Sequence, residues 1–195
     1  MIRVLSRAVV FLALVSAVTI CAAEEKKEKQ AKAKDVQKTV VIGAQAPEFK
    51  IKDKDGKIVS LSKLTEKGPV LVRLTCGCSG CDKELAYFQT LHEAYKGKGL
   101  TSVAIFRAPD DKVEDYVKLK KLNMLYAVDE KGEAWKTFQT KTMPTNFLIE
   151  KGGRIKSIAA GCEPSGLIAD ILSKKIATLL KTDTADLKTT DKKTK

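Results

Sequence analysis

The sequence predicts an α/β sandwich with a mixed sheet, and three features of its middle part lead to that prediction. Apolar runs rich in Val and Leu alternate with segments of helical periodicity over residues 68–139. Two hairpin patterns flank this alternation, one at 48–60 around an Asp-Gly turn and one from Pro144 to Gly161. Because strands joined by helices pair in parallel and hairpin strands pair antiparallel, the sheet is expected to contain both arrangements.

The order of strands and helices between residues 68 and 180 can be predicted from the sequence. The run "GPVLVRLT" (68–75) is typical of a buried strand, and apolar residues at helical spacing from Ser79 to Lys96 predict one long helix. The same two patterns then predict a strand at 101–108, a helix at 110–122, a strand at 124–129 and a short helix at 132–139. After the second hairpin, the amphipathic segment 164–180 predicts a closing helix.

The first 23 residues have the layout of a secretory signal peptide. A short basic start precedes the apolar run "AVVFLALVSAVTI", and small residues follow as far as Ala23. This run is too short to span a bilayer comfortably, so cleavage after Ala23 is expected. Lipidation of Cys21 and an uncleaved leader that anchors the chain are the alternatives. We therefore expect an exported protein, in the periplasm or another extracytoplasmic compartment.

The remaining chain divides into a charged disordered linker (24–39), one domain (40–181) and a disordered basic tail (182–195). The formal net charge is +12, but the lysines are spread out, which indicates solubility or a weak attraction to anionic membrane surfaces. No stretch interleaves aromatic residues with arginines, so no nucleic acid is expected as a partner. We expect a monomer that meets a membrane only through a retained leader or a lipidated Cys21.

The stretch "TCGCSGC" (75–81) concentrates three of the five cysteines within six residues. Cys78 and Cys81 are three apart where a buried strand is followed by a helix, so their side chains are neighbours at a distance that a disulfide accepts. The helix N-terminus favours a thiolate at Cys78, while Cys81, one turn further in, would resolve a mixed disulfide. The pattern predicts redox exchange, with a metal site and a structural disulfide as open alternatives.

A second pattern is Met143–Pro144, which opens the first strand of the second hairpin. Proline is tolerated at the start of a strand, and an X–Pro bond at such an entry can be cis. The residues alone leave cis and trans open.

Three stretches resemble the thioredoxin-like fold, in particular the AhpC/TSA-like exported redoxins, which include the membrane-tethered thiol–disulfide oxidoreductases that reduce apocytochrome c. They are "IGAQAPEFKIKDKDGKIVSLSKL", "PVLVRLTCGCSGCDKEL" and "YAVDEKGEAWKTFQTKTMPTNFLIEKGGRI". The resemblance covers about residues 40–181 and implies a three-layer α/β/α sandwich with an N-terminal β-hairpin. It also implies protein thiol or disulfide substrates, an upstream redox partner and no bound cofactor.

By this resemblance Cys78 is the attacking cysteine and Cys81 the resolving one, and Pro144 is a cis-proline facing them with Met143 before it. Gly161 matches a glycine that helps to form the partner-docking face.

Glu84 matches an acidic residue close to the disulfide, where a carboxylate could take or supply the exchange proton. A solvated helix residue is the alternative reading of Glu84. The chain departs from the family at Gly77, where an aromatic residue is usual, and at Ala86, where a proline is usual.

Two further cysteines are candidate accessory thiols. Cys76 is either a spare buried thiol or a partner of Cys78 in a strained bridge. Because the strand that ends at Gly161 runs back toward Pro144, we hypothesise that Cys162 sits near Cys78 and Cys81, as a second thiol or a metal ligand. An incidental cysteine at a helix entry is the alternative.

Two other functions compete with disulfide exchange. A thiol peroxidase would explain Thr75 three residues before Cys78, although Leu71 stands where such enzymes carry a proline and Arg107 is poorly placed for their arginine. A Cu(I)-binding module would use the clustered thiolates, with Cys162 and Met143 as candidate further ligands. If disulfide exchange is the function, no residue is predicted to bind a metal. The direction of electron flow is not fixed by these residues.

Overall fold

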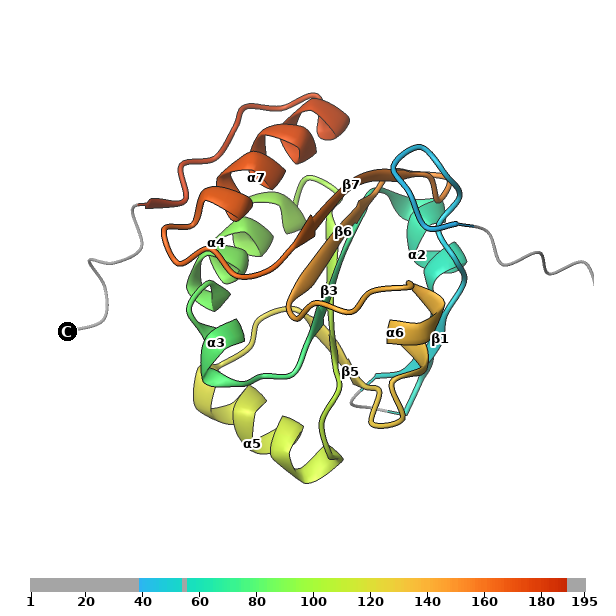
Figure 1. Cartoon of the computed structure of the whole chain (residues 1–195). Coiled ribbons are helices and arrows are strands. Elements are labelled where there is room, and N and C mark those ends of the chain that lie inside the picture. The colour runs from blue at the N-terminus through green and yellow to red at the C-terminus, as the bar shows by residue number, and fades with distance from the viewer. Residues whose placement is uncertain (1–38, 54–55, 189–195) are drawn as a thin grey trace, which may run out of the picture. The chain divides into compact units, whose positions relative to one another are not determined.

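The computed structural model describes residues 39–53 and 56–188, which form two sheets (Figure 1). The smaller sheet is the predicted hairpin, with β1 (Lys50–Lys52) antiparallel to β2 (Ile58–Ser60). The larger sheet has the order β5-β4-β3-β6-β7. Its strands are β3 (Val70–Thr75), β4 (Thr101–Phe106), β5 (Leu125–Val128), β6 (Thr145–Ile149) and β7 (Ile155–Ala160).

The larger sheet is mixed, as predicted. β3, β4 and β5 run parallel, whereas β6 is antiparallel to both β3 and β7. The helices are α2 (Leu61–Lys67), α3 (Ser79–Asp82), α4 (Leu85–Lys96), α5 (Asp110–Lys120), α6 (Glu133–Thr137) and α7 (Leu167–Leu180). Of these, α2 was not predicted from the sequence.

Two apolar cores, one on each face of the sheet, make three layers. Leu71 on β3 packs with residues of α4 and α7, including Phe88 and Leu172. Val72 on the opposite face of β3 packs with Trp135 of α6 and with residues near the hairpin. Figure 1 shows α4 and α7 on one face and α2 and α6 on the other. Because β3 is covered on both faces, its sequence is an almost continuous apolar run.

The predicted helix from Ser79 to Lys96 is wrong in its middle. The helix stops at Asp82 and restarts at Leu85, and Glu84 between them has φ −104° and ψ −7°. The interruption coincides with complete burial of the Glu84 side chain, which points into the domain rather than along a solvent-facing helix surface.

The predicted boundary at residue 181 is also wrong. Residues 182–188 pack on the domain, because Leu187 is fully buried in the core formed with α4 and α7. The backbone N–H of Ala185 donates a hydrogen bond to the Tyr95 hydroxyl at 2.8 Å. The leader, the linker up to residue 38 and the tail from 189 lie outside the described residues.

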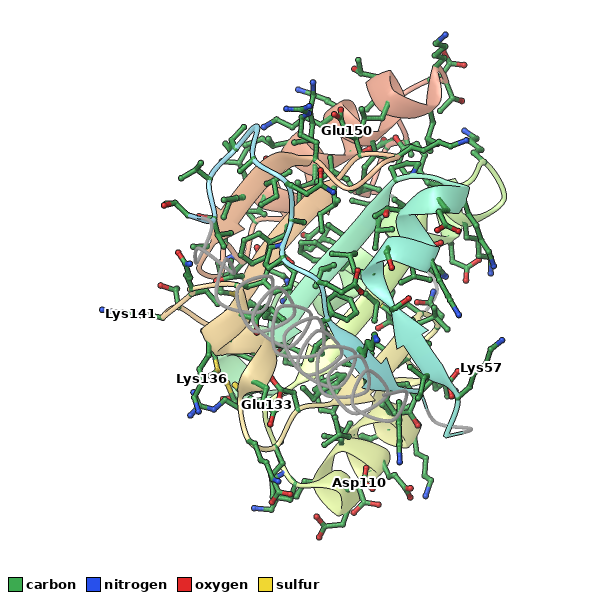
Figure 2. All side chains as sticks on the ribbon, turned by 90° about the vertical axis from the view of Figure 1, so that its right-hand side faces the viewer. Lys57, Asp110, Glu133, Lys136, Lys141 and Glu150 are labelled. Atoms are coloured by element: carbon green, nitrogen blue, oxygen red, sulfur yellow. The ribbon has the colours of Figure 1, made fainter. Side chains whose placement is uncertain are left out.

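The surface carries charges of both signs. Figure 2 shows labelled ionic side chains that point outward around the domain: Lys57, Asp110, Glu133, Lys136, Lys141 and Glu150. Among the described residues, no helix combines the length and the apolar character that crossing a membrane requires.

Candidate functional site

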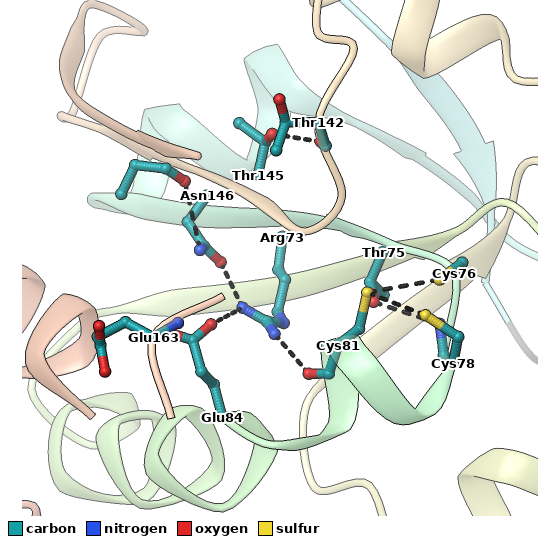
Figure 3. A network of polar contacts seen from close by, with 12 residues as sticks. Arg73, Thr75, Cys76, Cys78, Cys81, Glu84, Thr142, Thr145, Asn146 and Glu163 are labelled. Atoms are coloured by element: carbon teal, nitrogen blue, oxygen red, sulfur yellow. Dashed lines mark hydrogen bonds and ion pairs between the residues drawn. The ribbon is translucent and has the colours of Figure 1, made fainter. Parts of the chain in front are cut away.

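The three clustered cysteines lie where the central strand β3 ends. Cys76 follows β3, Cys78 caps the N-terminus of α3, and Cys81 lies inside α3 (Figure 3). The Sγ atoms of Cys78 and Cys81 are 3.6 Å apart, and the Sγ atoms of Cys76 and Cys81 are 3.4 Å apart. The structure therefore brings together all three thiols and not only the predicted pair.

The two cysteines of the predicted pair differ in exposure. Cys78 is exposed, whereas the Cys81 side chain is only 3% exposed. The pKa of Cys78 is lowered to about 7, first by a hydrogen bond from the Cys76 side chain and then by the backbone N–H of Cys81. Burial raises the pKa of Cys76 to about 12, so this thiol keeps its proton. The pKa of the exposed thiol is thus lowered, whereas the pKa of the neighbouring Cys76 thiol is raised.

The source of this acidity agrees in part with the expectation. The helix N-terminus was expected to stabilise the thiolate through its free N–H groups and its dipole, and the N–H groups of Cys81 and Gly80 do lower the pKa of Cys78. The helix α3 has only four residues, however, and the largest effect comes from the neighbouring Cys76 thiol, which was not expected. Gly77 allows Cys76 and Cys78 to turn toward the same place, because its φ of +66° is a left-handed conformation that favours glycine.

Pro144 lies beside the thiol cluster. The Met143–Pro144 peptide bond is cis. Thr145 pairs with Leu74 in the antiparallel β3–β6 register, so Pro144 comes next to the end of β3. The backbone N–H of Gly161 donates to the Pro144 carbonyl at 2.8 Å, and the φ of Gly161 is +94°. The predicted docking residues Pro144 and Gly161 are therefore in direct contact.

Glu84 is fully buried, so the alternative of a solvated residue is wrong. Its Oε1 accepts a hydrogen bond from the Glu163 backbone N–H at 2.9 Å. Its Oε2 lies 3.5 Å from Nη1 of Arg73, whose side chain is 3% exposed. The carboxylate thus has fixed partners on two segments that are far apart in sequence (Figure 3).

Arg73 is the residue that the sequence analysis missed. Its Nη2 donates to the Cys81 carbonyl at 3.0 Å and its Nη1 donates to Asn146 Oδ1 at 2.9 Å. The guanidinium also lies over the Phe88 ring, 4.3 Å from its centre. Burial lowers the pKa of Arg73, and the charge of Glu84 opposes that effect. The available signal was a single cation inside an otherwise apolar strand run.

Cys162 precedes Glu163, the residue whose N–H binds Glu84. Burial raises the pKa of the Cys162 thiol, the charge of Glu84 adds to this, and the charge of Arg73 opposes it. The hydrogen bond between the adjacent Glu163 N–H and buried Glu84 supports a position of Cys162 on the same side of the domain as the thiol cluster.

The outer face of α3 is held by α5, which sequence reasoning did not foresee. The Tyr116 hydroxyl donates to Asp82 Oδ1 at 2.8 Å, and Lys120 Nζ lies 2.6 Å from Asp82 Oδ2. The short helix that carries Cys81 is therefore held on both sides. Arg73 contacts it from the interior of the domain, and Tyr116 and Lys120 contact it from the outside.

Comparison with known proteins agrees with this geometry. The family model described as the AhpC/TSA family matches residues 42–158. The chain belongs to the AhpC/TSA family. A relative in Bacillus thuringiensis subsp. konkukian, the thiol-disulfide oxidoreductase ResA, is 33% identical over 134 residues, which is 68% of this chain and 78% of the relative.

Solved structures related to this redoxin show the same fold. A DsbE-type thiol:disulfide interchange protein from Chlorobium tepidum is 26% identical, with a TM-score of 0.65 over 72% of this chain and 99% of its own. The thioredoxin domain of the thiol-disulfide oxidoreductase BVU-2223 from Bacteroides vulgatus is 20% identical, with a TM-score of 0.59 over 70% and 98% of the chains. The fold is therefore thioredoxin-like, and the chain is related to thiol–disulfide oxidoreductases.

Three residues of this AhpC/TSA protein bear on a peroxidase activity, namely Thr75, Leu71 and Arg107. The Thr75 hydroxyl is buried and accepts a hydrogen bond from the Gly77 N–H at 3.3 Å. Leu71 is a core residue, and Arg107 is exposed and packs against Gly132. None of these contacts favours peroxide chemistry over disulfide exchange.

Proposed function

We propose that this AhpC/TSA redoxin is an extracytoplasmic thiol–disulfide oxidoreductase that exchanges the Cys78–Cys81 pair with thiols or disulfides of other proteins. One observation carries the proposal: an exposed sulfur with a lowered pKa lies 3.6 Å from a buried sulfur. The two sulfurs must approach by only about 1.5 Å to form a disulfide. The relatives named thiol-disulfide oxidoreductases support the same activity.

In the reducing direction, the Cys78 thiolate attacks a substrate disulfide and one substrate sulfur leaves as a thiolate. A mixed disulfide now joins Cys78 to the substrate. Cys81 then gives up its proton and attacks the Sγ of Cys78, and the second substrate thiolate leaves. The substrate gains two electrons, and the protein keeps a Cys78–Cys81 disulfide that an upstream dithiol partner must reduce. The same steps in reverse oxidise a dithiol.

The segment from Met143 to Pro144, with Gly161 beside it, is the proposed docking face for the substrate chain. A Cβ atom on Gly161 would have no heavy atom within 4 Å, which indicates free space at this position. This space lies next to Pro144, so an extended substrate segment would have room where the exposed Cys78 can reach it.

Glu84 is proposed as a positioning residue. Both of its oxygens are already engaged, by Arg73 and by the Glu163 N–H. Arg73 in turn holds the Cys81 carbonyl. The pair fixes the backbone that carries the resolving sulfur.

The proposal is tested by two matched substitutions, Cys78→Ser and Cys81→Ser. We expect Cys81→Ser to accumulate a mixed disulfide with a disulfide-bonded protein such as insulin, because the resolving step is lost. We expect Cys78→Ser to form none, since the remaining sulfur of the pair is buried. Both species are measured by mass spectrometry after acid quenching. Equal trapping by the two variants would exclude Cys78 as the attacking residue.

The direction of exchange in the compartment depends on the reduction potential of the Cys78–Cys81 pair. Equilibration with glutathione redox buffers measures it, and a potential near those of reducing thioredoxins would indicate a reductase. Export is part of the proposal. The intact mass of the protein recovered from an exporting bacterial host would show whether the chain begins after Ala23, as we propose.

A further inference from the structure

The structure assigns a second capacity to the thiol cluster. We propose that the reduced protein binds one soft, thiophilic metal ion between Cys76, Cys78 and Cys81, with Cu(I) as the ion that fits best. The bound ion would block disulfide exchange. The proposal uses the same sulfurs as the proposed function but requires Cys76, which disulfide exchange does not.

The sulfur atoms of Cys76, Cys78 and Cys81 form a compact triangle. The three Sγ atoms all lie within 4.8 Å of one another, and two of the separations are 3.4 and 3.6 Å. In a triangle with these sides, the point equidistant from all three sulfurs is about 2.4 Å or less from each, close to the metal–thiolate distance of about 2.3 Å known for zinc. One ion could therefore contact all three sulfurs with small side-chain adjustments.

The same triangle argues against a simple exchange of disulfides among the three cysteines. With these separations, the directions from Cys81 Sγ to the other two sulfurs enclose about a right angle or less, whereas a thiolate displaces a disulfide sulfur along the S–S axis. Cys76 is therefore poorly aligned to displace Cys78 from Cys81. It is well placed to share a common ligand with both.

The donor set favours a soft ion. Among the described residues, this cluster contains sulfur donors only. Thiolates select Cu(I), zinc and iron–sulfur clusters over hard cations. Structural zinc almost always takes four protein ligands, so three sulfurs leave it one ligand short. Three thiolates, in contrast, complete the trigonal coordination that Cu(I) adopts. The cluster therefore suits Cu(I) better than zinc.

The surroundings meet two further needs of such a site. Cys78 is exposed, which gives an ion a route of entry, while Cys81 is buried and closes the inner side. Because thiolates are the ligands, binding of the ion displaces the thiol protons to solvent, including that of Cys76. The Arg73 guanidinium, which is paired with Glu84, donates to the Cys81 carbonyl at 3.0 Å and so fixes the backbone that carries the inner sulfur.

The test is a titration of the full chain, reduced and kept without oxygen, with Cu(I) in competition with a chromogenic chelator. X-ray absorption counts the sulfurs around the bound copper. We expect one Cu(I) per chain with three sulfur neighbours, and we expect iodoacetamide labelling of Cys78 to slow at least tenfold when the ion is bound. The variant Cys76→Ala should lose at least tenfold in affinity and show two sulfurs. Cys162→Ala, which removes a cysteine outside the cluster, should bind as the wild type does.

Several results would overturn the proposal: two sulfur neighbours in the wild type, an unchanged affinity in Cys76→Ala, or Zn(II) displacing Cu(I) at equal concentration. The proposed function can fail separately. A protein that exchanges disulfides but binds no Cu(I) would remove only the metal site. A protein that binds Cu(I) through three sulfurs but traps no substrate would remove only the exchange activity.

Discussion

The two sides of Cys81 are built from opposite chemistry. On the outer side lie two further thiols, and Cys78 is open to solvent. On the inner side Arg73 and Glu84 are buried and hold fixed hydrogen-bond partners on α3, β6 and the segment before α7. The reactive sulfurs and the residues that hold the backbone therefore lie on different sides of Cys81. The outer side can change its bonding partner because the inner side fixes the backbone that presents the resolving sulfur.

The variant Cys78→Ser removes the exposed sulfur on the outer side and leaves the inner side unchanged. It has the largest expected effect on turnover. Turnover of a disulfide-bonded protein should fall on the order of 10³-fold or more, because Cys78 is the one exposed cysteine in the part of the chain that the structure describes. The free energy of unfolding, measured with urea at pH 7 or below, should change by less than about 0.5 kcal/mol, since Cys78 is exposed and its ionisation contributes little there. Retained turnover would show that Cys78 is not the attacking residue.

The variant Arg73→Met removes the buried cation on the inner side, together with its contacts to Glu84 and the Cys81 carbonyl. It leaves Glu84 buried without its cation, so the free energy of unfolding should fall by about 3–5 kcal/mol in urea titration. The matched control is Arg154→Met, because Arg154 is 65% exposed and pairs with Glu150 at 3.6 Å. That variant should lose no more than about 1 kcal/mol.

A double variant sharpens this prediction. Replacing Arg73 and Glu84 together by methionine removes both buried charges and should recover most of the lost stability. If Arg73→Met and Arg154→Met lose the same amount, the inner side contributes no more than a surface ion pair.

The pH dependence of Cys78 tests the link between Cys76 and the outer side. The rate of iodoacetamide labelling of Cys78 should rise with pH through about 7, because the thiolate reacts and its pKa is lowered from the ordinary value of 9. Cys76→Ala removes the first cause of that shift and should move the midpoint upward. A midpoint that does not move would assign the acidity to the backbone N–H groups alone.

The lowered pKa of Cys78 also makes the free energy of unfolding depend on pH. Because folding lowers the pKa of Cys78, its ionisation contributes to the stability fully above pH 9, and the contribution is lost as the pH falls through about 7. Urea titrations of the reduced protein between these two values, compared with Cys78→Ser, measure it.

The smallest expected effect concerns the attachment of α3 to α5. Tyr116→Phe removes the hydrogen bond to Asp82, while the Lys120 contact remains. The free energy of unfolding should fall by about 1 kcal/mol. The labelling rate of Cys78 should stay the same, because Arg73 still holds Cys81 from within. A slower or faster rate would show that the inner side alone does not position the cluster.

Much of the fold was predictable because its signals are local. The Asp-Gly hairpin, the apolar run of β3 and the helical spacing of α4, α5 and α7 depend on neighbours within a few residues. The break at Glu84 was not predictable in this way. It coincides with the burial of a carboxylate whose partners are Arg73 and the N–H of Glu163, which lie 11 and 79 positions away.

Three features can be read from the amino-acid sequence before any folding is considered: the order of strands and helices, the placement of Cys78 and Cys81 at a strand-to-helix junction, and the proline that opens β6. These depend on periodicity and spacing, which the chain carries whatever it later contacts. Three other features emerge only when the chain is folded: Arg73 and Glu84 are buried together, Cys76 lies beside Cys78 and Cys81, and residues 182–188 pack on the domain. Each of these results from contacts between segments far apart in the chain, and such contacts depend on how the layers pack.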